Sequence, residues 1–209
     1  MIYEYVRIRV PAGGWPDAAA TIFGPLRRDL EADEGRIFGV YRSIIGAPMN
    51  EGVVITAHAD VETWAEYRRG EKIHAHEGVE RIDSALLAPS VRPLPDAVAD
   101  APGVYAHRWF DISPGSWPDF VRLSEEGWWP AVEGAGARVE GLWSALGGAA
   151  EGHAFLLTRY ESMAHWERTR FSTPESQAGL SEVARHAMAR RMSLTLGSTV
   201  RIMAPVRPS

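Results

Sequence analysis

The sequence predicts an α+β protein made of two tandem ferredoxin-like units, each with the element order βαββαβ, which close into one intramolecular α/β barrel. Two observations lead to this prediction. The second half of the chain repeats the first at a constant offset of 102 positions, as Trp15 and Trp117 illustrate, and both halves alternate strand-like and helix-like segments in the same order. Such a unit carries helices on one face of its sheet, so a second copy is the natural cover for the other face.

The repeat consists of uncommon residues in register. Trp15-Pro16-Asp17 falls on Trp117-Pro118-Asp119. Glycines, arginines, a threonine and a tryptophan recur at the same offset, namely Gly13/Gly115, Arg36/Arg138, Gly39/Gly141, Gly46/Gly148, Thr56/Thr158, Trp64/Trp166 and Arg68/Arg170. We therefore predict a first repeat over 1–92, a Pro/Ala-rich linker over 93–103 and a second repeat over 104–209. The register slips late, where Ser84 and Val91 match Ser193 and Val200, which predicts a longer second helix in the second repeat.

The elements follow the same plan in each repeat. A first strand stops at a Pro/Gly turn, a helix follows, two strands are joined through a glycine-containing connection, and a second helix leads into a last strand. Ser116 with Asp119 forms an N-capping pattern for the first helix of the second repeat, and Asp60 and Ser162 are good N-caps for the second helices. The predicted strands are Ile2–Val10, Arg36–Ile45, Val53–Ala59, Leu86–Val91, Val104–Ile112, Arg138–Ala145, Ala154–Tyr160 and Leu194–Met203.

Composition excludes several classes of function. The net charge is −5 and no basic cluster stands against it, so nucleic acid is not expected as a partner. Cysteine is absent, which excludes disulfides, a cysteine nucleophile, thiolate-ligated haem and iron–sulfur clusters. Lys72 is the single lysine and a poor Schiff-base candidate. The chain opens in strand-like sequence, without a signal-like segment, and contains no membrane-length apolar run, so we expect a cytoplasmic protein with no membrane partner.

Several segments of the second half resemble the NIPSNAP domain. They are Asp111–Phe120, Trp129–Glu133, Ala137–Trp143 and His153–Arg168. The first half matches more weakly, through Gly39-Val40-Tyr41 and Asp60–Ala65. NIPSNAP proteins belong to the dimeric α/β-barrel superfamily, so the resemblance implies the barrel fold in a tandem form. It implies little about chemistry, because that superfamily includes monooxygenases, haem enzymes and isomerases.

The first strands of the two repeats differ at one informative position. Alternation places Val104, Ala106, Arg108, Phe110 and Ile112 on the same face of the strand, which the first repeat makes apolar except at Glu4. Arg108 stands where the first repeat has Val6. A buried guanidinium is costly unless it is paired. Either Glu125 or Glu126 supplies a structural partner, or Arg108 anchors an anionic group of a ligand.

His107 is the best candidate for acid–base chemistry, because an imidazole exchanges its proton near neutral pH. Tyr105 and Trp109 flank it on the same face, and Tyr105 is the predicted hydrogen-bonding neighbour. The alternative is a structural histidine in the barrel interior. His58 and His153 are weaker versions of the same case.

Trp128 and Trp143 are candidates for lining a pocket for a flat apolar ligand, with core packing as the alternative. Arg159, on a strand of the second repeat, is a further candidate for substrate binding. His74-Ala75-His76-Glu77 does not have metal-ligand spacing if it is helical, because residues two apart do not converge there, and no metal is predicted. No cofactor motif is present, and no residue is marked as a proximal haem ligand.

The leading hypothesis is a protein that binds a small aromatic or polyketide-like molecule in a pocket between the sheet and helices of the second repeat. If it is an enzyme, it acts without a metal or nucleotide cofactor, with His107 and Tyr105 as catalytic residues and Arg108 as anchor. Two alternatives are a non-catalytic binding or scaffold protein and a haem-binding member of the superfamily. A homodimer is left open.

Overall fold

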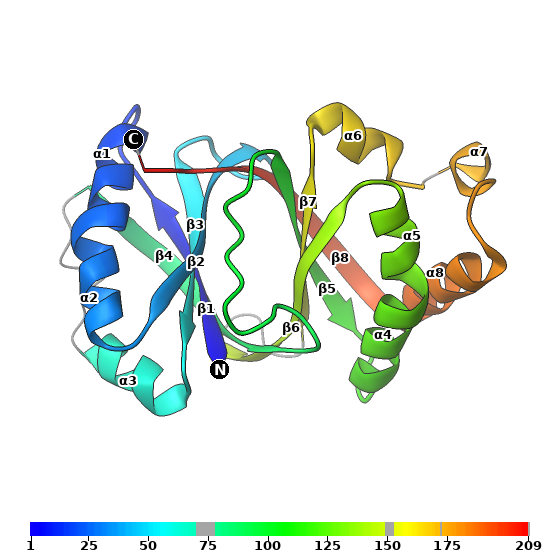
Figure 1. Cartoon of the computed structure of the whole chain (residues 1–209), viewed down its shortest axis with the longest axis horizontal. Coiled ribbons are helices and arrows are strands. Elements are labelled where there is room, and N and C mark those ends of the chain that lie inside the picture. Colours follow the sequence, from blue (N-terminus) through cyan, green and yellow to red (C-terminus); the bar gives the residue numbers. More distant parts are fainter. Residues whose placement is uncertain (70–77, 149–152, 172, 209) are drawn as a thin grey trace.

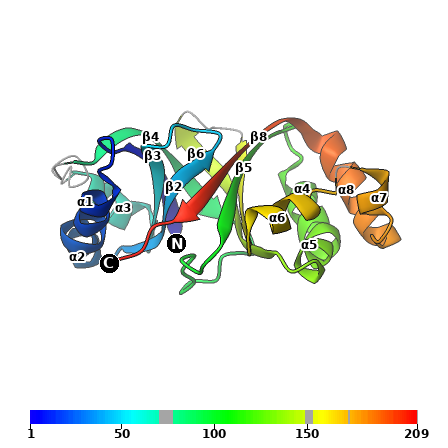
Figure 2. The same cartoon turned by 90° about the horizontal axis from the view of Figure 1, so that it is seen from above.

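A computed structural model of the chain describes residues 1–69, 78–148, 153–171 and 173–208. Eight antiparallel strands form a closed barrel in the order β1-β3-β2-β8-β5-β7-β6-β4. Figures 1 and 2 show the barrel in the middle of the molecule, with helices of the first half at one end and helices of the second half at the other. The predicted α/β barrel of ferredoxin-like repeats is confirmed, whereas the division into repeats with a linker over 93–103 remains a prediction.

The first half contains β1 (Ile2–Arg9), α1 (Trp15–Thr21), the π-helical turn η1 (Ile22–Leu26), α2 (Arg27–Ala32), β2 (Arg36–Ile45), β3 (Glu51–His58), α3 (Val61–Arg69) and β4 (Glu80–Pro89). The second half contains β5 (Val104–Ile112), α4 (Trp117–Leu123), the π-helical turn η2 (Ser124–Trp128), α5 (Trp129–Gly134), β6 (Arg138–Gly148), β7 (His153–Tyr160), α6 (Met163–Arg168), α7 (Pro174–Gln177), α8 (Glu182–Leu194) and β8 (Thr195–Pro205). The segment His74–Glu77 and Lys72 lie outside the described residues.

The repeated Trp-Pro-Asp tripeptide marks the start of a helix in both halves. α1 begins at Trp15 and α4 at Trp117, with the proline and the aspartate in the first turn. A proline there loses no helical hydrogen bond, and an aspartate favours the positive end of the helix dipole. The predicted N-caps of the second helices are confirmed, because Asp60 accepts from the Thr63 amide and Ser162 from the His165 amide. Ser116 is the N-cap of α4 but makes no side-chain cap hydrogen bond.

The two sheets join at their edges to close the barrel. Within each half the last strand pairs with the first, and the first with the third. The halves then meet through β2 with β8 and β4 with β6, both antiparallel. No edge strand is left unpaired among the described strands, which removes the template for edge-to-edge association that an open sheet presents.

The last strands correspond in a different register from the one the sequence predicted. Tyr3 pairs with Leu87 and the equivalent Tyr105 pairs with Met203, so Leu87 and Met203 occupy the same place in the two sheets. The predicted match of Val91 with Val200 is therefore wrong. Next to an insertion, a few chance identities favoured an alignment of the two sequences that differs from the structural one. β4 and β8 also begin and end at other residues than predicted. The extra residues of the second half form α7 and most of α8, rather than one longer helix.

Aromatic side chains from both halves fill the barrel. Tyr3, Phe38, Trp143 and Phe155 are buried in one cluster, in which the rings of Trp143 and Phe155 stack with centroids 5.2 Å apart. The repeated Gly39 and Gly141 make room for this cluster. A Cβ at Gly141 would lie 2.3 Å from the Trp143 ring, and one at Gly39 would lie equally close to the Tyr41 hydroxyl. Within the described ranges, no helix has the length and apolar character needed to span a membrane.

Gly141→Ala is expected to destabilise the protein by about 1–3 kcal/mol, because the new methyl group overlaps a ring that has no space to move. Gly134→Ala is the control, since a Cβ at the end of α5 would meet nothing within 4 Å. Chemical denaturation of both variants checks the prediction. Equal stabilities would show that the barrel interior can shift to accept the methyl group.

Candidate functional site

Strand β5 presents the predicted site residues on two opposite faces. Arg108 and its alternate neighbours Ala106 and Phe110 point toward the helices of the second half and line a cavity there. Tyr105 and His107 belong to the other face, where both are fully buried among the aromatic side chains of the barrel. Successive residues of a strand point to opposite sides of a sheet. The hypothesis of one pocket served by both His107 and Arg108 is therefore wrong.

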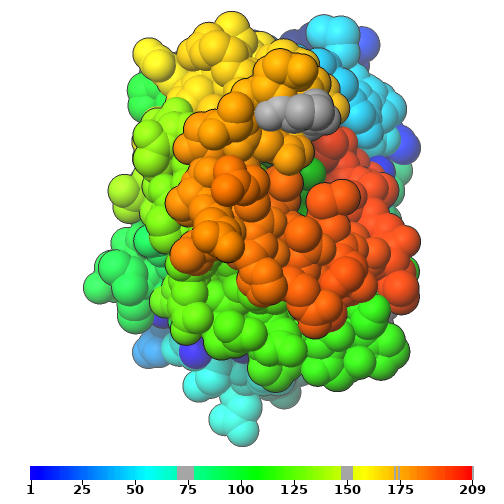
Figure 3. Space-filling view, turned by 90° about the vertical axis from the view of Figure 1, so that its right-hand side faces the viewer, coloured from blue at the N-terminus to red at the C-terminus, as the bar shows by residue number. Residues whose placement is uncertain are grey.

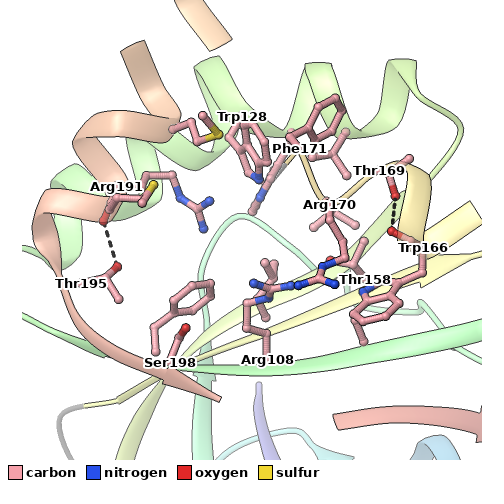
Figure 4. A pocket seen from close by; sticks show the side chains of 18 of the residues that line it. Arg108, Trp128, Thr158, Trp166, Thr169, Arg170, Phe171, Arg191, Thr195 and Ser198 are labelled. Atoms are coloured by element: carbon pink, nitrogen blue, oxygen red, sulfur yellow. Dashed lines mark hydrogen bonds between the residues drawn. The ribbon is translucent and has the colours of Figure 1, made fainter. Parts of the chain in front are cut away.

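A cavity of about 600 Å³ lies between the sheet and the helices of the second half. Its floor consists of β5, β6, β7 and β8. Its walls come from η2, α5, α6 and α8, with residues 169–171 and Gln177 of α7. Figure 4 shows Trp128, Phe171 and Trp166 around it, with Arg108 rising from the sheet. The size and the mixture of aromatic and charged walls are typical of a small-molecule site.

The additional helices of the second half create one side of this cavity. α8 packs on η2, and Gly127 allows the close contact, since a Cβ there would lie 2.4 Å from the Ala187 methyl group. Figure 3 views this end of the molecule, where α7 and α8 cover the space above the sheet. The first half has no such helices among its described residues, and there the side chains of β1, α1 and α2 pack directly into an apolar core.

Arg191 is a buried cation of the cavity wall. It is 7% exposed, and its guanidinium lies over the rings of Phe110 and Phe120, 5.4 and 4.5 Å from their centroids. Its Nε and Nη2 atoms have no hydrogen-bond partner among the described residues. Burial, and secondarily the positive charge of Arg108, lower the pKa of Arg191 to about 9. The group therefore keeps its proton at neutral pH, and the cavity wall carries a buried charge.

Two further arginines face the same space. Figure 4 shows the side chains of Arg108 and Arg170 beside each other. Burial lowers the pKa of Arg108; the Tyr160 phenol opposes this shift and the positive charge of Arg170 adds to it. Arg170 pairs with the exposed Glu167, at 3.3 Å, and stacks over Trp166. Glu126, one of the two predicted partners of Arg108, lies instead 3.6 Å from Arg122 on the helix surface.

His107 sits in a closed environment inside the barrel. Its Nδ1 lies 3.3 Å from the Tyr5 hydroxyl, and its Nε2 has no partner among the described residues. Burial, and to a lesser degree the charge of Arg201, lower the pKa of His107 to about 3, so the imidazole is neutral at pH 7. Tyr105 donates its hydroxyl proton to the Ala101 carbonyl oxygen rather than to His107. Their catalytic roles stay predictions, and neither residue lines the cavity.

Of the remaining predicted site residues, one lines the cavity and two lie elsewhere. Trp128 is partly exposed and lines the cavity, where it contacts Phe171 edge-on. Trp143 belongs to the barrel interior. Arg159 donates to Glu140, at 3.2 Å, and to the Pro102 carbonyl oxygen, away from the cavity.

Sequence patterns do not identify Arg170 or Arg191 as site residues. Arg170 repeats Arg68, and a residue kept in both halves is expected to serve the fold. Arg191 lies in the segment without a counterpart in the first half, so comparison of the two repeats gives no signal for it.

The cavity offers poor ligands for haem iron. No histidine is among its lining residues within the described part of the chain, and Tyr160, Met188 and Met192 are the side chains of types that occur as axial ligands. Burial raises the pKa of Tyr160, which favours the phenol over the phenolate that would bind iron. The described residues therefore do not fit a haem site here.

Comparisons with known proteins agree with the architecture. The sequence model of the NIPSNAP family matches residues 105–209. A search of curated proteins found no significant match.

Three solved structures share the whole fold. A candidate monooxygenase from Fusobacterium nucleatum has a TM-score of 0.62 at 8% identity, over 99% of this chain and 92% of its own. An anthrone oxidase-like protein has a TM-score of 0.61 at 10% identity, over 99% and 92%. A haem-binding protein from Thermus thermophilus has a TM-score of 0.59 at 12% identity, over 99% and 91%. At these identities the similarity establishes a common fold.

Proposed function

The chain belongs to the NIPSNAP family, and we propose that its second half binds a small aromatic or polyketide-like molecule in the cavity between the sheet and helices. The observation that carries the proposal is the cavity itself. It is large enough for a ligand of two or three fused rings, and Trp128, Trp166 and Phe171 supply flat apolar surfaces around it. Aromatic rings bind other rings through stacked and edge-on contacts.

The scaffold alternative is less well supported. A protein that only presents surfaces to a partner has no need of a cavity of this size, and in the first half an apolar cluster joins the helices to the sheet. Acid–base chemistry by His107 is not part of the proposal, because the sheet separates that residue from the cavity. The proposed ligand class follows from the residues of the cavity and does not depend on the activities named for the three solved structures.

Titration with anilinonaphthalene sulfonate and with neutral phenylnaphthylamine tests the proposal. We expect at least one of these fluorescent probes to bind one site per chain. Ser198→Trp should remove that binding, because Ser198 is an exposed residue of the cavity lining where an indole would fill the entrance. Thr199→Trp is the matched control, because Thr199 is also exposed and neighbours Ser198, but its side chain lies outside the cavity lining. Absence of binding for both probes, or equal binding by the two variants, would overturn the proposal.

A further inference from the structure

The cavity holds more positive charge than the protein itself neutralises. Arg191 is more than nine-tenths buried and has two nitrogen atoms without partners, and neither Arg191 nor Arg108 forms an ion pair among the described residues. Arg170 adds a third guanidinium, shared with one exposed carboxylate. Unpaired buried charge is destabilising, so proteins retain it mainly where something else supplies the opposite charge.

In the first half a buried carboxylate neutralises the arginines on the corresponding face of the sheet. There Glu4 is buried, and its Oε1 lies 3.7 Å from Arg68 Nε and 3.5 Å from Arg81 Nη2. Glu4 pairs across the sheet with Thr56, and Ala106 pairs with the equivalent Thr158, so Ala106 holds the place of Glu4 in the second half.

The second half has a different set of charges, and Ser198 pairs with Phe110 where Arg81 pairs with the equivalent Ile8. The losses and gains together leave the second half more positive on this face. It has lost the carboxylate at the position of Ala106, has gained Arg108 where the first half has Val6, and keeps Arg170 where the first half has Arg68. Arg191 adds another positive charge from α8, a helix that has no equivalent in the described part of the first half. These differences all fall on residues that line the cavity.

We infer that the ligand is an aromatic molecule with a carboxylate or similarly charged oxyanion group, which occupies the place of the missing Glu4 carboxylate and binds to Arg108 and Arg191. This inference rests on the proposed function. Guanidinium groups suit a carboxylate because they offer parallel N–H donors. The orphaned donors of Arg191 then gain partners. The rings of the ligand lie against the aromatic walls, which include the Trp128 and Phe171 side chains seen in Figure 4.

The two probes distinguish this inference from the proposed function, because they share the same rings and differ by the sulfonate. We expect the anionic probe to bind at least tenfold more tightly than the neutral one. Arg191→Met should weaken the anionic probe by about 10- to 100-fold, the usual range for a lost charge-assisted hydrogen bond, and leave the neutral probe unchanged. Arg190→Met, next to it on an exposed turn of α8, is the matched control.

A second pair of variants tests the place of the anion. Ala106→Glu restores the carboxylate of the first half and should both raise the thermal midpoint without probe and weaken the anionic probe at least tenfold. Ala106→Gln has nearly the same volume without the charge, and should weaken that probe much less. If the neutral probe binds as well as the anionic one, or if Ala106→Glu and Ala106→Gln act alike, the inference is overturned while the proposed function stands. If neither probe binds, the proposed function fails first.

Discussion

Replacing Trp143 with alanine is expected to lower the free energy of unfolding by about 3–5 kcal/mol, the usual cost of removing a fully buried large aromatic side chain. The Trp143 ring is fully buried, stacks on Phe155, and meets the rings of Tyr3 and Phe38 edge-on. The space left behind lies at the centre of a closed barrel, so it cannot collapse easily. Denaturant unfolding followed by circular dichroism measures the change.

Trp128→Ala serves as the comparison, because Trp128 is the other tryptophan that the sequence marks for ligand binding. Its ring is partly exposed at the cavity and contacts Phe171. We expect Trp128→Ala to cost less stability than Trp143→Ala and to weaken the aromatic probes, since it removes one wall of the cavity. Trp143→Ala should leave probe affinity unchanged at temperatures where the variant is folded. The opposite pattern would place the ligand inside the barrel.

The architecture could be predicted because the two halves of a duplicated chain can be compared with each other. Residues kept in both halves report what the fold requires: Trp117-Pro118-Asp119 begins a helix, and Gly141 gives room to a buried ring. The change from Val6 to Arg108 likewise marks the face of β5 that lines the cavity. The ends of the strands and the alignment of the last strands were harder to predict, because the two sequences can be aligned in several ways of similar quality around a short insertion.

The site itself was only half predictable. Arg108 follows from alternation along one strand, which depends on residues close in sequence. Arg191 comes to Arg108 through the packing of α8 on η2, which depends on the contact between Gly127 and Ala187 and is not visible in the pattern of either helix. Grouping His107 with Arg108 failed for a simpler reason, since neighbours in a strand lie on opposite faces of the sheet.

Acidification from pH 7 to pH 5 is expected to lower the free energy of unfolding by roughly 4 kcal/mol, about 2 kcal/mol from each of two buried histidines. Burial lowers the pKa of His107 from 6.5 to about 3. Burial likewise lowers the pKa of His58 to about 4, against the opposing effect of Asp33. Because the unfolded chain binds protons more readily than the folded one in this range, this stability is present above pH 6.5 and is lost as the pH falls toward 4.

Urea denaturation of each variant at pH 7 and at pH 5 measures this loss, with every variant compared with itself. His107→Phe and His58→Gln should each remove about half of the pH dependence, and His186→Gln, an exposed histidine on α8, should follow the wild type. His107→Phe should also leave both aromatic probes bound as before, because the imidazole contacts Tyr5, Tyr41 and Phe155 inside the barrel. If it removed probe binding without changing the acid response, His107 would belong to the ligand site after all, as the sequence alone predicted.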